Sequence, residues 1–186
     1  MPDSFRIETE VPILETKRLL LRGHRLDDFV HCVSMWADPE VTRYIGGKPL
    51  TEEEAWTKFL RYAGHWKLLG FGYWVVEEKA TASYVGEIGF ADYKRDLNPP
   101  LGSVPEIGWA LASRVHGKGY ATEAILAAVA WGDLHFKRAT ACIIEPQNIP
   151  SIKVADKCGY REKHQATYRG KSVTLFAREW NGIANE

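Results

Sequence analysis

The chain has 186 residues, of which 45% are hydrophobic and 26% charged, an ordinary balance for a soluble globular protein with a substantial core. Lysine plus arginine and aspartate plus glutamate each total 24, so the formal net charge is zero and gives no support to nucleic-acid binding. The first ten residues carry several charges, and no apolar run approaches the roughly 20 residues of a membrane helix. We therefore expect no signal peptide, no membrane span and a cytoplasmic location.

The first 50 residues predict one strand and one helix. Residues 18–22 (RLLLR) are strand-like, and Asp27 or Asp28 is placed to cap a helix that runs to about Trp36. Residues 39–50 are expected to form a loop or a short helix.

A second helix is predicted to begin after Thr51. Thr51 and Glu54 have the spacing of a capping box, in which each side chain accepts a hydrogen bond from the backbone N–H of the other residue. Large or apolar side chains then recur at helical spacing and are expected to face the core: Ala55, Phe59, Tyr62 and Trp66.

Three strands are predicted side by side in the middle of the chain. Residues 71–78 and 83–90 are rich in β-branched and aromatic side chains and are separated by a short polar stretch, which predicts an antiparallel hairpin. Residues 98–102 are expected to be a loop, and residues 104–111 the third adjacent strand.

The second half of the chain predicts alternating helices and strands. The pattern indicates helices over residues 120–134 and 148–157, with a strand over residues 138–145 between them. Residues 160–168 and 171–180 are expected to close the fold as a hairpin. Antiparallel strands, a strand–helix–strand unit and a final hairpin together predict an α+β (mixed α/β) fold.

The cysteines and histidines predict neither disulfide nor metal chemistry. Cys32, Cys142 and Cys158 form no CxxC pair, and the six histidines lack the spacing of metal ligands. No base adjoins Cys142 or Cys158 in the sequence, which argues against an acyl-cysteine mechanism. We expect buried, reduced thiols and no bound metal.

The glycine turn before the predicted helix at residue 120 is the strongest functional signal. Gly117 and Gly119 follow a strand and precede a helix, so backbone N–H groups and the helix dipole can converge on a phosphate. A Walker A loop is excluded because only one residue separates the glycines. A dinucleotide-binding turn needs glycine or alanine at Thr122, although Glu145 ends the next strand, where an acidic ribose partner would lie. A plain tight turn is the other alternative.

Two patterns in the second half of the chain fit one known family. Arg114, Gly117 and Gly119 match Gln/Arg-x-x-Gly-x-Gly/Ala, and residues 148–151 (NIPS), followed by residues 159–160 (GY), are similar to Asn-x-x-Ser/Ala…Gly-Phe. In these positions the chain resembles the GNAT superfamily of acetyl-CoA-dependent N-acetyltransferases.

Both ends of the chain resemble one branch of that superfamily. Residues 15–22 and 168–180 are similar to the branch that contains the RimJ/RimL ribosomal-protein N-terminal acetyltransferases. The resemblance covers about residues 14–180, and it implies a single N-acetyltransferase domain over residues 1–186.

The resemblance implies a fold and a way of binding acetyl-CoA. The fold would be the GNAT acyl-CoA N-acyltransferase fold, with a central, largely antiparallel, splayed sheet flanked by helices. The pantetheine arm would pair with exposed strand backbone, and the diphosphate would lie on the N–H groups of residues 114–121. The residues implied to bind acetyl-CoA are Trp109, Leu111, Arg114, Gly117, Lys118, Gly119, Ala121, Thr122, Asn148 and Ser151.

The implied reaction is direct attack of a primary amine on the thioester in a ternary complex. Because an alkylamine is mostly protonated at neutral pH, a carboxylate must remove a proton, directly or through water. Glu106 is the first candidate for this base and Glu87, on the neighbouring strand, is the second. The alternative for both is a surface charge on an edge strand. A backbone N–H near Trp109 or Ala110 would stabilise the oxyanion.

The departing thiolate would need a nearby hydroxyl group. Many relatives carry a tyrosine seven residues after the motif asparagine, whereas this chain has Ala155. Ser151 is then the implied partner of the sulfur, with a serine that bonds only helix backbone as the alternative. Asn148 would contact the pantetheine or brace the ends of the β-strands, and a role as helix N-cap is compatible with either.

The acceptor amine is left open by the sequence. A protein N-terminus, a polyamine, an amino acid and an aminated antibiotic all fit, and specificity is expected to lie in residues 24–70 and 160–175. The resemblance implies that Trp36, Tyr44, Gly46 and Gly47 lie where this family shapes its acceptor pocket. No nucleic acid or membrane partner is expected, and a homodimer is possible because many relatives dimerise. The alternatives to an enzyme of this class are a non-catalytic acyl-CoA-binding module and a nucleotide-dependent oxidoreductase.

Overall fold

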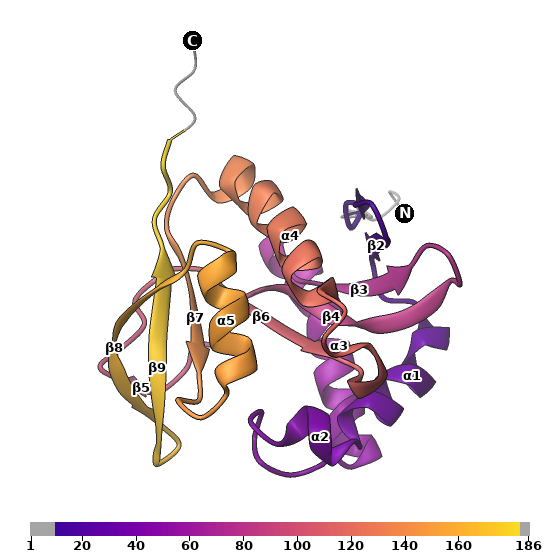
Figure 1. The fold of residues 1–186 in the computed structure, drawn as a ribbon, viewed down its shortest axis with the longest axis horizontal. Coiled ribbons are helices and arrows are strands. Elements are labelled where there is room, and N and C mark those ends of the chain that lie inside the picture. Colours follow the sequence, from indigo (N-terminus) through magenta and orange to yellow (C-terminus); the bar gives the residue numbers. More distant parts are fainter. Residues whose placement is uncertain (1–9, 183–186) are drawn as a thin grey trace, which may run out of the picture.

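The computed structural model describes residues 10–182, which form a sheet with helices on both of its faces (Figure 1). The strands are β1 (Leu14–Glu15), β2 (Leu19–Arg22), β3 (Tyr73–Glu78), β4 (Ser83–Ala91), β5 (Leu97–Asn98), β6 (Glu106–Leu111), β7 (Thr140–Ile144), β8 (Arg161–Tyr168) and β9 (Lys171–Arg178). The helices are α1 (Phe29–Trp36), α2 (Pro39–Thr42), α3 (Glu52–Leu69), α4 (Tyr120–Phe136) and α5 (Ile149–Lys157), with 3-10 turns η1 (Leu26–Asp28) and η2 (Ser113–Val115).

Within residues 10–182 the strands form one nine-stranded sheet in the order β1-β2-β3-β4-β6-β7-β9-β8-β5. Neighbouring strands are antiparallel except for β6 and β7, which are parallel and share one paired position, Glu106 with Ala141. The predicted mixed α/β fold with a largely antiparallel, splayed sheet is therefore confirmed.

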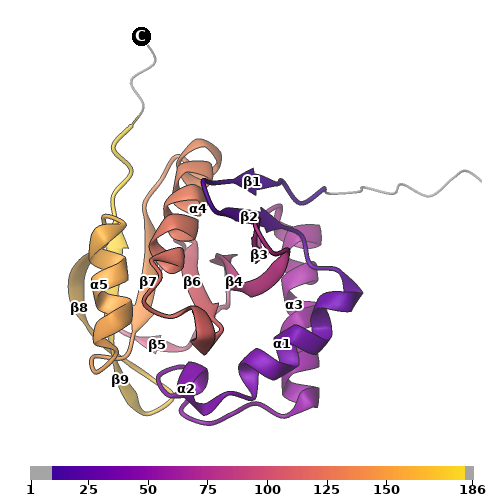
Figure 2. The same ribbon diagram turned by 45° about the vertical axis from the view of Figure 1, so that its right-hand side comes forward.

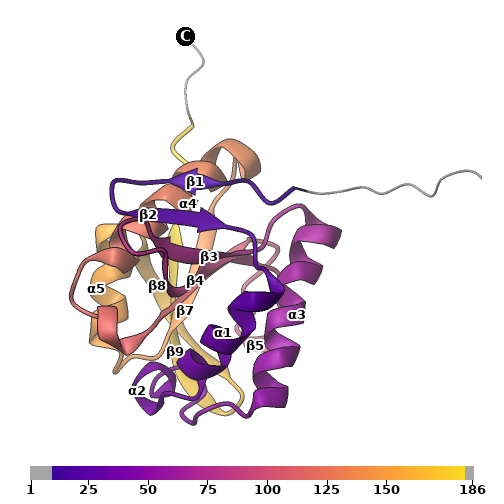
Figure 3. The same ribbon diagram turned by 90° about the vertical axis from the view of Figure 1, so that its right-hand side faces the viewer.

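The two faces of the sheet are covered by different helices. The face that carries Trp74, Ile88 and Phe90 packs against α4 and α5, whereas the face that carries Val75 and Ala110 packs against α1 and α3. Figures 2 and 3 show α5 and α1–α3 on opposite sides of the sheet. A molecule that enters the sheet between β6 and β7 therefore meets α4 and α5 on one side and α3 on the other.

Local sequence signals fix both ends of the long helix α3. Thr51 Oγ1 accepts from the Glu54 N–H at 3.2 Å, and Glu54 Oε2 accepts from the Thr51 N–H at 2.8 Å, so the predicted capping box is confirmed. Gly70 ends the helix with a left-handed φ of 72°, which glycine adopts without a Cβ clash.

The start of α1 differs from its prediction. Asp28 occupies the N-cap position, but its side chain makes no capping hydrogen bond to α1. Instead its two oxygens accept from the Arg22 guanidinium, both at 2.8 Å, and one also accepts from the Arg25 N–H at 2.6 Å. The predicted side-chain cap is wrong because buried Arg22 takes this carboxylate as its ion-pair partner.

Most predicted elements are present within a few residues of their expected bounds. Residues 39–50 contain the short helix α2. The two-residue strands β1 and β5 were not predicted, and β5 enters the sheet through its pairing with β8. In the part of the chain that the structure describes, no helix is both long and apolar enough to cross a membrane.

Candidate active site

The sheet opens between β6 and β7. Ala141 donates to the Pro105 carbonyl at 3.1 Å, and Glu106 is the last residue of β6 with a partner on β7. Over the rest of its length, within the described residues, the β6 edge that faces β7 has no ladder partner. This opening is the splay expected of the fold.

The backbone of β6 presents hydrogen-bonding groups to this opening. Ala112 donates to the Val85 carbonyl on the β4 side at 2.9 Å, and successive residues of a strand alternate in the direction of their N–H and C=O groups. Ile107, Trp109 and Leu111 therefore direct these groups toward β7. An extended ligand lying in the opening would meet them as a strand meets its neighbour.

A cavity of about 470 Å³ occupies the opening. It extends from α5 and the end of β7, past β6, to α3 and the tip of the β8–β9 hairpin. Its lining residues are Trp36, Tyr44, Ile45, Gly46, Leu50, Lys58, Arg61, Tyr62, Tyr73, Tyr93, Arg95, Glu106, Ile107, Gly108, Trp109, Ala110, Cys142, Ile143, Ile144, Glu145, Asn148, Ser151, Tyr168, Arg169, Lys171, Ser172 and Val173.

The glycine turn that follows β6 presents a row of free N–H groups. Gly117 and Gly119 have φ values of 77° and 76°, a region that favours glycine. The N–H groups of Gly117 and of residues 119–122 have no acceptor among residues 10–182. Free N–H donors at the N-terminus of a 17-residue helix are an arrangement that suits an anion.

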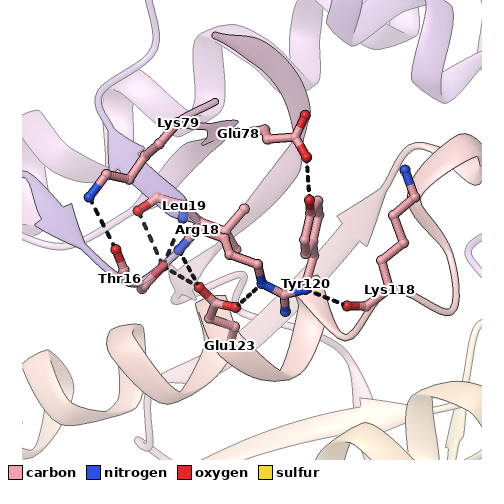
Figure 4. Close-up of polar contacts among 8 residues, drawn as sticks. All are labelled: Thr16, Arg18, Leu19, Glu78, Lys79, Lys118, Tyr120 and Glu123. Atoms are coloured by element: carbon pink, nitrogen blue, oxygen red, sulfur yellow. Dashed lines mark hydrogen bonds and ion pairs between the residues drawn. The ribbon is translucent and has the colours of Figure 1, made fainter. Parts of the chain in front are cut away.

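A polar network fixes the start of α4 against the segment between β1 and β2 and against the end of β3 (Figure 4). Glu123 accepts from the Thr16 hydroxyl at 2.6 Å, the Arg18 N–H at 2.8 Å and Arg18 Nε at 2.7 Å. Arg18 also donates to the Lys118 carbonyl at 2.9 Å, and the Tyr120 hydroxyl donates to Glu78. These bonds position the turn from the outside and leave its N–H groups free.

The side chains of the predicted diphosphate site do not all face a ligand. The Arg114 guanidinium donates to the Tyr84 carbonyl, so its predicted charge-assisted contact with a phosphate would require this bond to break. His116 approaches the Leu111 carbonyl at 2.9 Å and occupies one of the acceptor groups of β6. The Lys118 side chain is exposed beside the turn, and its charge is felt by Glu78.

The start of α5 forms the opposite wall of the opening. Asn148 is the N-cap, and its Oδ1 accepts from the Ser151 N–H at 3.2 Å. Both side chains line the cavity, and the Ser151 hydroxyl makes no hydrogen bond to another described residue. Ala155 is fully buried in the core, so a tyrosine at this position would overpack it. The chain therefore lacks the tyrosine hydroxyl of the family pattern and is also packed for a small side chain there.

Glu106 lies in the cavity at the point where β6 and β7 part. It is only 4% exposed, and its two oxygens accept from Arg95 Nε at 2.6 Å and Arg95 Nη2 at 2.8 Å. The alternative of an edge-strand surface charge is therefore wrong for Glu106. A carboxylate has about four lone-pair positions, so this pair leaves capacity for a further hydrogen bond.

Glu87, the second candidate base, is fully buried beneath the cavity. Trp36 Nε1 and the Tyr84 hydroxyl donate to it at 3.0 and 2.8 Å, and His24 Nε2 lies 3.7 Å away. Burial alone would raise the pKa of Glu87, but the neighbouring His24 imidazole, the charge of Lys58 and the Trp36 hydrogen bond outweigh it and bring the pKa to about 2. The expectation of a surface charge is wrong here also, because β4 is a central strand.

Lys58 and Tyr62 of α3 form the part of the cavity above Glu87. Lys58 Nζ lies 4.1 Å from the centre of the Trp36 ring and 5.7 Å from that of Tyr62. Burial lowers the pKa of Lys58 to about 8, against the opposing charge of Glu87. The ammonium is still the main form at neutral pH.

A family model described as an acetyltransferase (GNAT) domain matches residues 18–161. The chain belongs to the GNAT acetyltransferase family. It is 29% identical over 153 residues to the uncharacterized N-acetyltransferase p20 of Bacillus licheniformis, covering 81% of this chain and 83% of that protein. It is 30% identical over 152 residues to the uncharacterized N-acetyltransferase YnaD of Bacillus subtilis, with coverage of 81% and 83%. A crystal structure of an acetyltransferase from Agrobacterium tumefaciens matches with a TM-score of 0.79 and 26% identity, over 91% of this chain and 95% of that one.

This GNAT protein is thus an N-acetyltransferase, with a fold that binds acetyl-CoA. Two structures solved with coenzyme A share the fold: a RimL ribosomal L7/L12 α-N-protein acetyltransferase at 14% identity (TM-score 0.73) and a spermidine N-acetyltransferase from Vibrio cholerae at 16% (TM-score 0.69). At these identities the likeness is one of fold alone, so the RimJ/RimL branch stays a prediction.

The cysteines of this acetyltransferase are free and buried, as the sequence predicted. Burial raises the pKa of the Cys158 thiol to about 11 and that of Cys142 well above its ordinary value, so neither is a ready nucleophile. Within the described residues no group of three or more His, Cys, Asp or Glu side chains is arranged to hold a metal ion.

Several cavity residues of this GNAT protein were not predicted from the sequence. Lys58, Arg61 and Arg95 reach the opening from α3 and from the loop after β4. The helical spacing of Lys58 and Arg61 was a usable signal, since both lie on the α3 face that carries Tyr62. Glu145, considered only as a ribose partner, lines the cavity at the end of β7.

Proposed function

We propose that this enzyme transfers the acetyl group of acetyl-CoA to a primary amine by direct attack in a ternary complex. The observation that carries the proposal is the opening between β6 and β7, with unpaired β6 backbone on one side and the N-terminus of α4 at its end. As one domain with a core over about residues 14–180, it would act in the cytoplasm.

Binding of acetyl-CoA would use main-chain groups fixed by the fold. The pantetheine arm would lie against Trp109 and Leu111, and the diphosphate would accept from the N–H groups of Gly117, Gly119 and Ala121. Thr122 would add a further N–H and Lys118 a charge. Arg114 would contribute through the backbone of the turn, since its side chain is bonded to Tyr84.

Glu106 would receive the proton of the attacking amine, directly or through a water molecule. The amine nitrogen forms a bond to the acetyl carbon, the carbon–sulfur bond breaks, and the proton passes to Glu106 and then to solvent. Arg95 would hold the carboxylate in place through its two hydrogen bonds. Glu87 is excluded from direct proton transfer because it has no exposed surface.

Ser151 would support the departing sulfur. Its hydroxyl lines the cavity and has no partner among the described residues, so it is free to donate to the sulfur as the carbon–sulfur bond breaks. The Asn148 amide, whose oxygen is bonded to the Ser151 N–H, would orient both this serine and the pantetheine. A backbone N–H of β6 near Trp109 would stabilise the oxyanion.

An α-amine suits this site better than a side-chain amine. Its pKa of about 7.7–8.0 leaves a large neutral fraction near neutral pH, whereas an alkylamine with a pKa near 10.4 would depend strongly on a base. The carboxylate at the opening is shared with Arg95, which supports acceptors that need little help with deprotonation. This agrees with a place in the RimJ/RimL branch, whose members act on protein N-termini.

Substitution of Gly119 tests the donor site. Gly119→Glu would put a negative charge and a Cβ at the N-terminus of α4, and we expect the affinity for coenzyme A to fall at least about 100-fold by isothermal titration calorimetry. Gly70→Glu is the matched control, because Gly70 has a similar φ of 72°, open space around it and a place outside the cavity. Equal affinities in the two variants would contradict the assigned site.

A non-catalytic acyl-CoA-binding module is the second candidate function. It is favoured by the engagement of Glu106 with Arg95 and by Ala155 in place of a tyrosine. Release of free thiol from acetyl-CoA in the presence of an amine and peptide library decides between the two. Binding without amine-dependent thiol release would support the module.

A further inference from the structure

We propose that the acceptor amine carries a carboxylate, which is bound by Lys58 and Arg61 on the α3 side of the cavity. This inference deepens the proposed acetyl transfer and rests on it. The two cations lie across the β6 strand from the helices that would hold coenzyme A, on the side from which an amine would approach the thioester.

The cavity lining has an excess of positive charge. Five cations line it, namely Lys58, Arg61, Arg95, Arg169 and Lys171, against two carboxylates, Glu106 and Glu145. Glu106 is paired with Arg95, and Glu145 lies on the β7 side, close to the start of α5. The cavity lining contributed by α3 and by the tip of the β8–β9 hairpin is therefore positively charged and includes no carboxylate.

Lys58 and Arg61 are held close together without an anion between them. They stand three residues apart on α3, where like charges repel, and each lies over the face of an aromatic ring, which attracts a cation. Lys58 Nζ lies 4.1 Å from the centre of the Trp36 ring and the Arg61 guanidinium 4.7 Å from that of Tyr93. Within residues 10–182 neither forms an ion pair with a carboxylate.

The nearest buried anion is already satisfied. Glu87 attracts Lys58, but its oxygens accept from Trp36 and Tyr84 and lie beside His24, and the residue is fully buried. It therefore neutralises part of the Lys58 charge from below and leaves the side that faces the cavity open. Arg61 has no such counter-charge among residues 10–182 and is exposed at the rim.

The phosphates of coenzyme A would not fill this position. The free N–H groups that suit a diphosphate are at the start of α4, which packs on the opposite face of the sheet from α3. The anion for Lys58 and Arg61 must then come from the acceptor. A polyamine would place a second, positively charged amine beside these cations, and the repulsion disfavours its binding.

An acceptor panel of matched charge tests this inference. Thiol release from acetyl-CoA is measured with L-glutamine and L-asparagine against their α-carboxamides, and with C-terminally amidated dipeptides that have glutamate or glutamine at the second position, so that only one member of each pair has a carboxylate. Spermidine is the cationic comparison. We expect kcat/KM to be about 10- to 100-fold higher for each carboxylate than for its amide. The amino-acid and dipeptide arms distinguish a free amino acid from a peptide N-terminus.

Substitutions on α3 test whether Lys58 and Arg61 cause the preference for a carboxylate-bearing acceptor. Arg61→Gln and Lys58→Gln should each reduce kcat/KM for the preferred carboxylate about tenfold or more and leave the value for its amide within about threefold. Lys67→Gln, on the same helix but outside the cavity lining, is the control and should keep the full preference. The affinity for coenzyme A should be unchanged in all three variants.

The outcomes separate this inference from the function on which it rests. Faster turnover of the amides or of spermidine would overturn the inference and leave the acetyltransferase in place. If no amine is turned over, calorimetry with the N-acetylated forms of one such pair, with and without the carboxylate, in the presence of coenzyme A provides the second readout. Equal binding of the two would overturn the inference, whereas failure of coenzyme A itself to bind would remove the proposed function.

Discussion

Gly108 on β6 has no room for a side chain, and its replacement by alanine gives the sharpest test of the acceptor side of the cavity. A Cβ at this position would lie 2.1 Å from the Tyr73 hydroxyl oxygen and 3.3 Å from Tyr73 Cζ. Tyr73 is held from behind by Tyr62, whose ring is stacked on it at 4.4 Å, and the backbone of Gly89 packs against its Cα. The ring must therefore tilt within a packed wall.

The size of the effect follows from this overlap. Non-bonded heavy atoms pack at about 3.5–4.0 Å, so the Tyr73 oxygen must move by more than about 1 Å. Overpacking of this kind costs about 1–3 kcal/mol of folding free energy, or about 2–12 °C in Tm for a chain of this size. Because Tyr73 lines the cavity, we expect kcat/KM for the acceptor to fall about tenfold, with coenzyme A affinity within about twofold of wild type.

A double-mutant cycle with Tyr73→Phe decides whether the overlap is the cause. Without the hydroxyl, the closest ring atom is at 3.3 Å, so Gly108→Ala should cost less than about 1 kcal/mol in that background. Gly64→Ala is the control, since its Cβ on α3 meets nothing within 4 Å and should stabilise the protein by about 0.5–1 kcal/mol. An equal loss from Gly108→Ala in both backgrounds, measured by urea unfolding, would refute the reasoning.

Two further predictions concern the carboxylates that hold the site together. The pKa of Glu87 is lowered from 4.5 to about 2, so the stability that its charge contributes is complete above pH 4.5 and declines as the pH falls toward 2. Between pH 6 and pH 3 the free energy of unfolding, measured by urea titration, should fall by about 2 kcal/mol more in wild type than in Glu87→Gln. Equal falls in the two proteins would count against a buried charge at Glu87. Glu123→Ala should remove three hydrogen bonds at the start of α4 and weaken coenzyme A binding about three- to tenfold by calorimetry, whereas an unchanged affinity would mean that the network does not position the turn.

Local chemistry explains why so many of the elements could be predicted from the sequence. The capping box of Thr51 and Glu54 acts within one turn, and the strand, glycine turn and helix around Gly117 and Gly119 are fixed by neighbouring residues. The same holds for the Asn148 cap of α5. Each of these signals depends on residues a few positions apart, which is the range over which a single sequence is informative.

Long-range pairing explains what could not be predicted. β1 and β5 are two residues long and exist only because β2 and β8 offer them an edge. The burial of Glu87 depends on donors from Trp36 and Tyr84, and the position of Glu106 depends on Arg95. Nothing in the neighbouring sequence marks these partners, so an interior glutamate and an edge glutamate have the same local pattern.

The single paired position between β6 and β7 has a consequence for the stability of the whole molecule. Main-chain continuity between the two wings of the sheet depends on that junction, because the strands share no other ladder bond within residues 10–182. A pantetheine arm bonded to β6 would bridge the wings and act as a missing strand. Occupancy and folding would then be linked, with about 2.7 kcal/mol of added stability at a ligand concentration 100 times its dissociation constant. On this proposal, the donor substrate would supply the hydrogen bonds that the sheet lacks between β6 and β7 before it reacts.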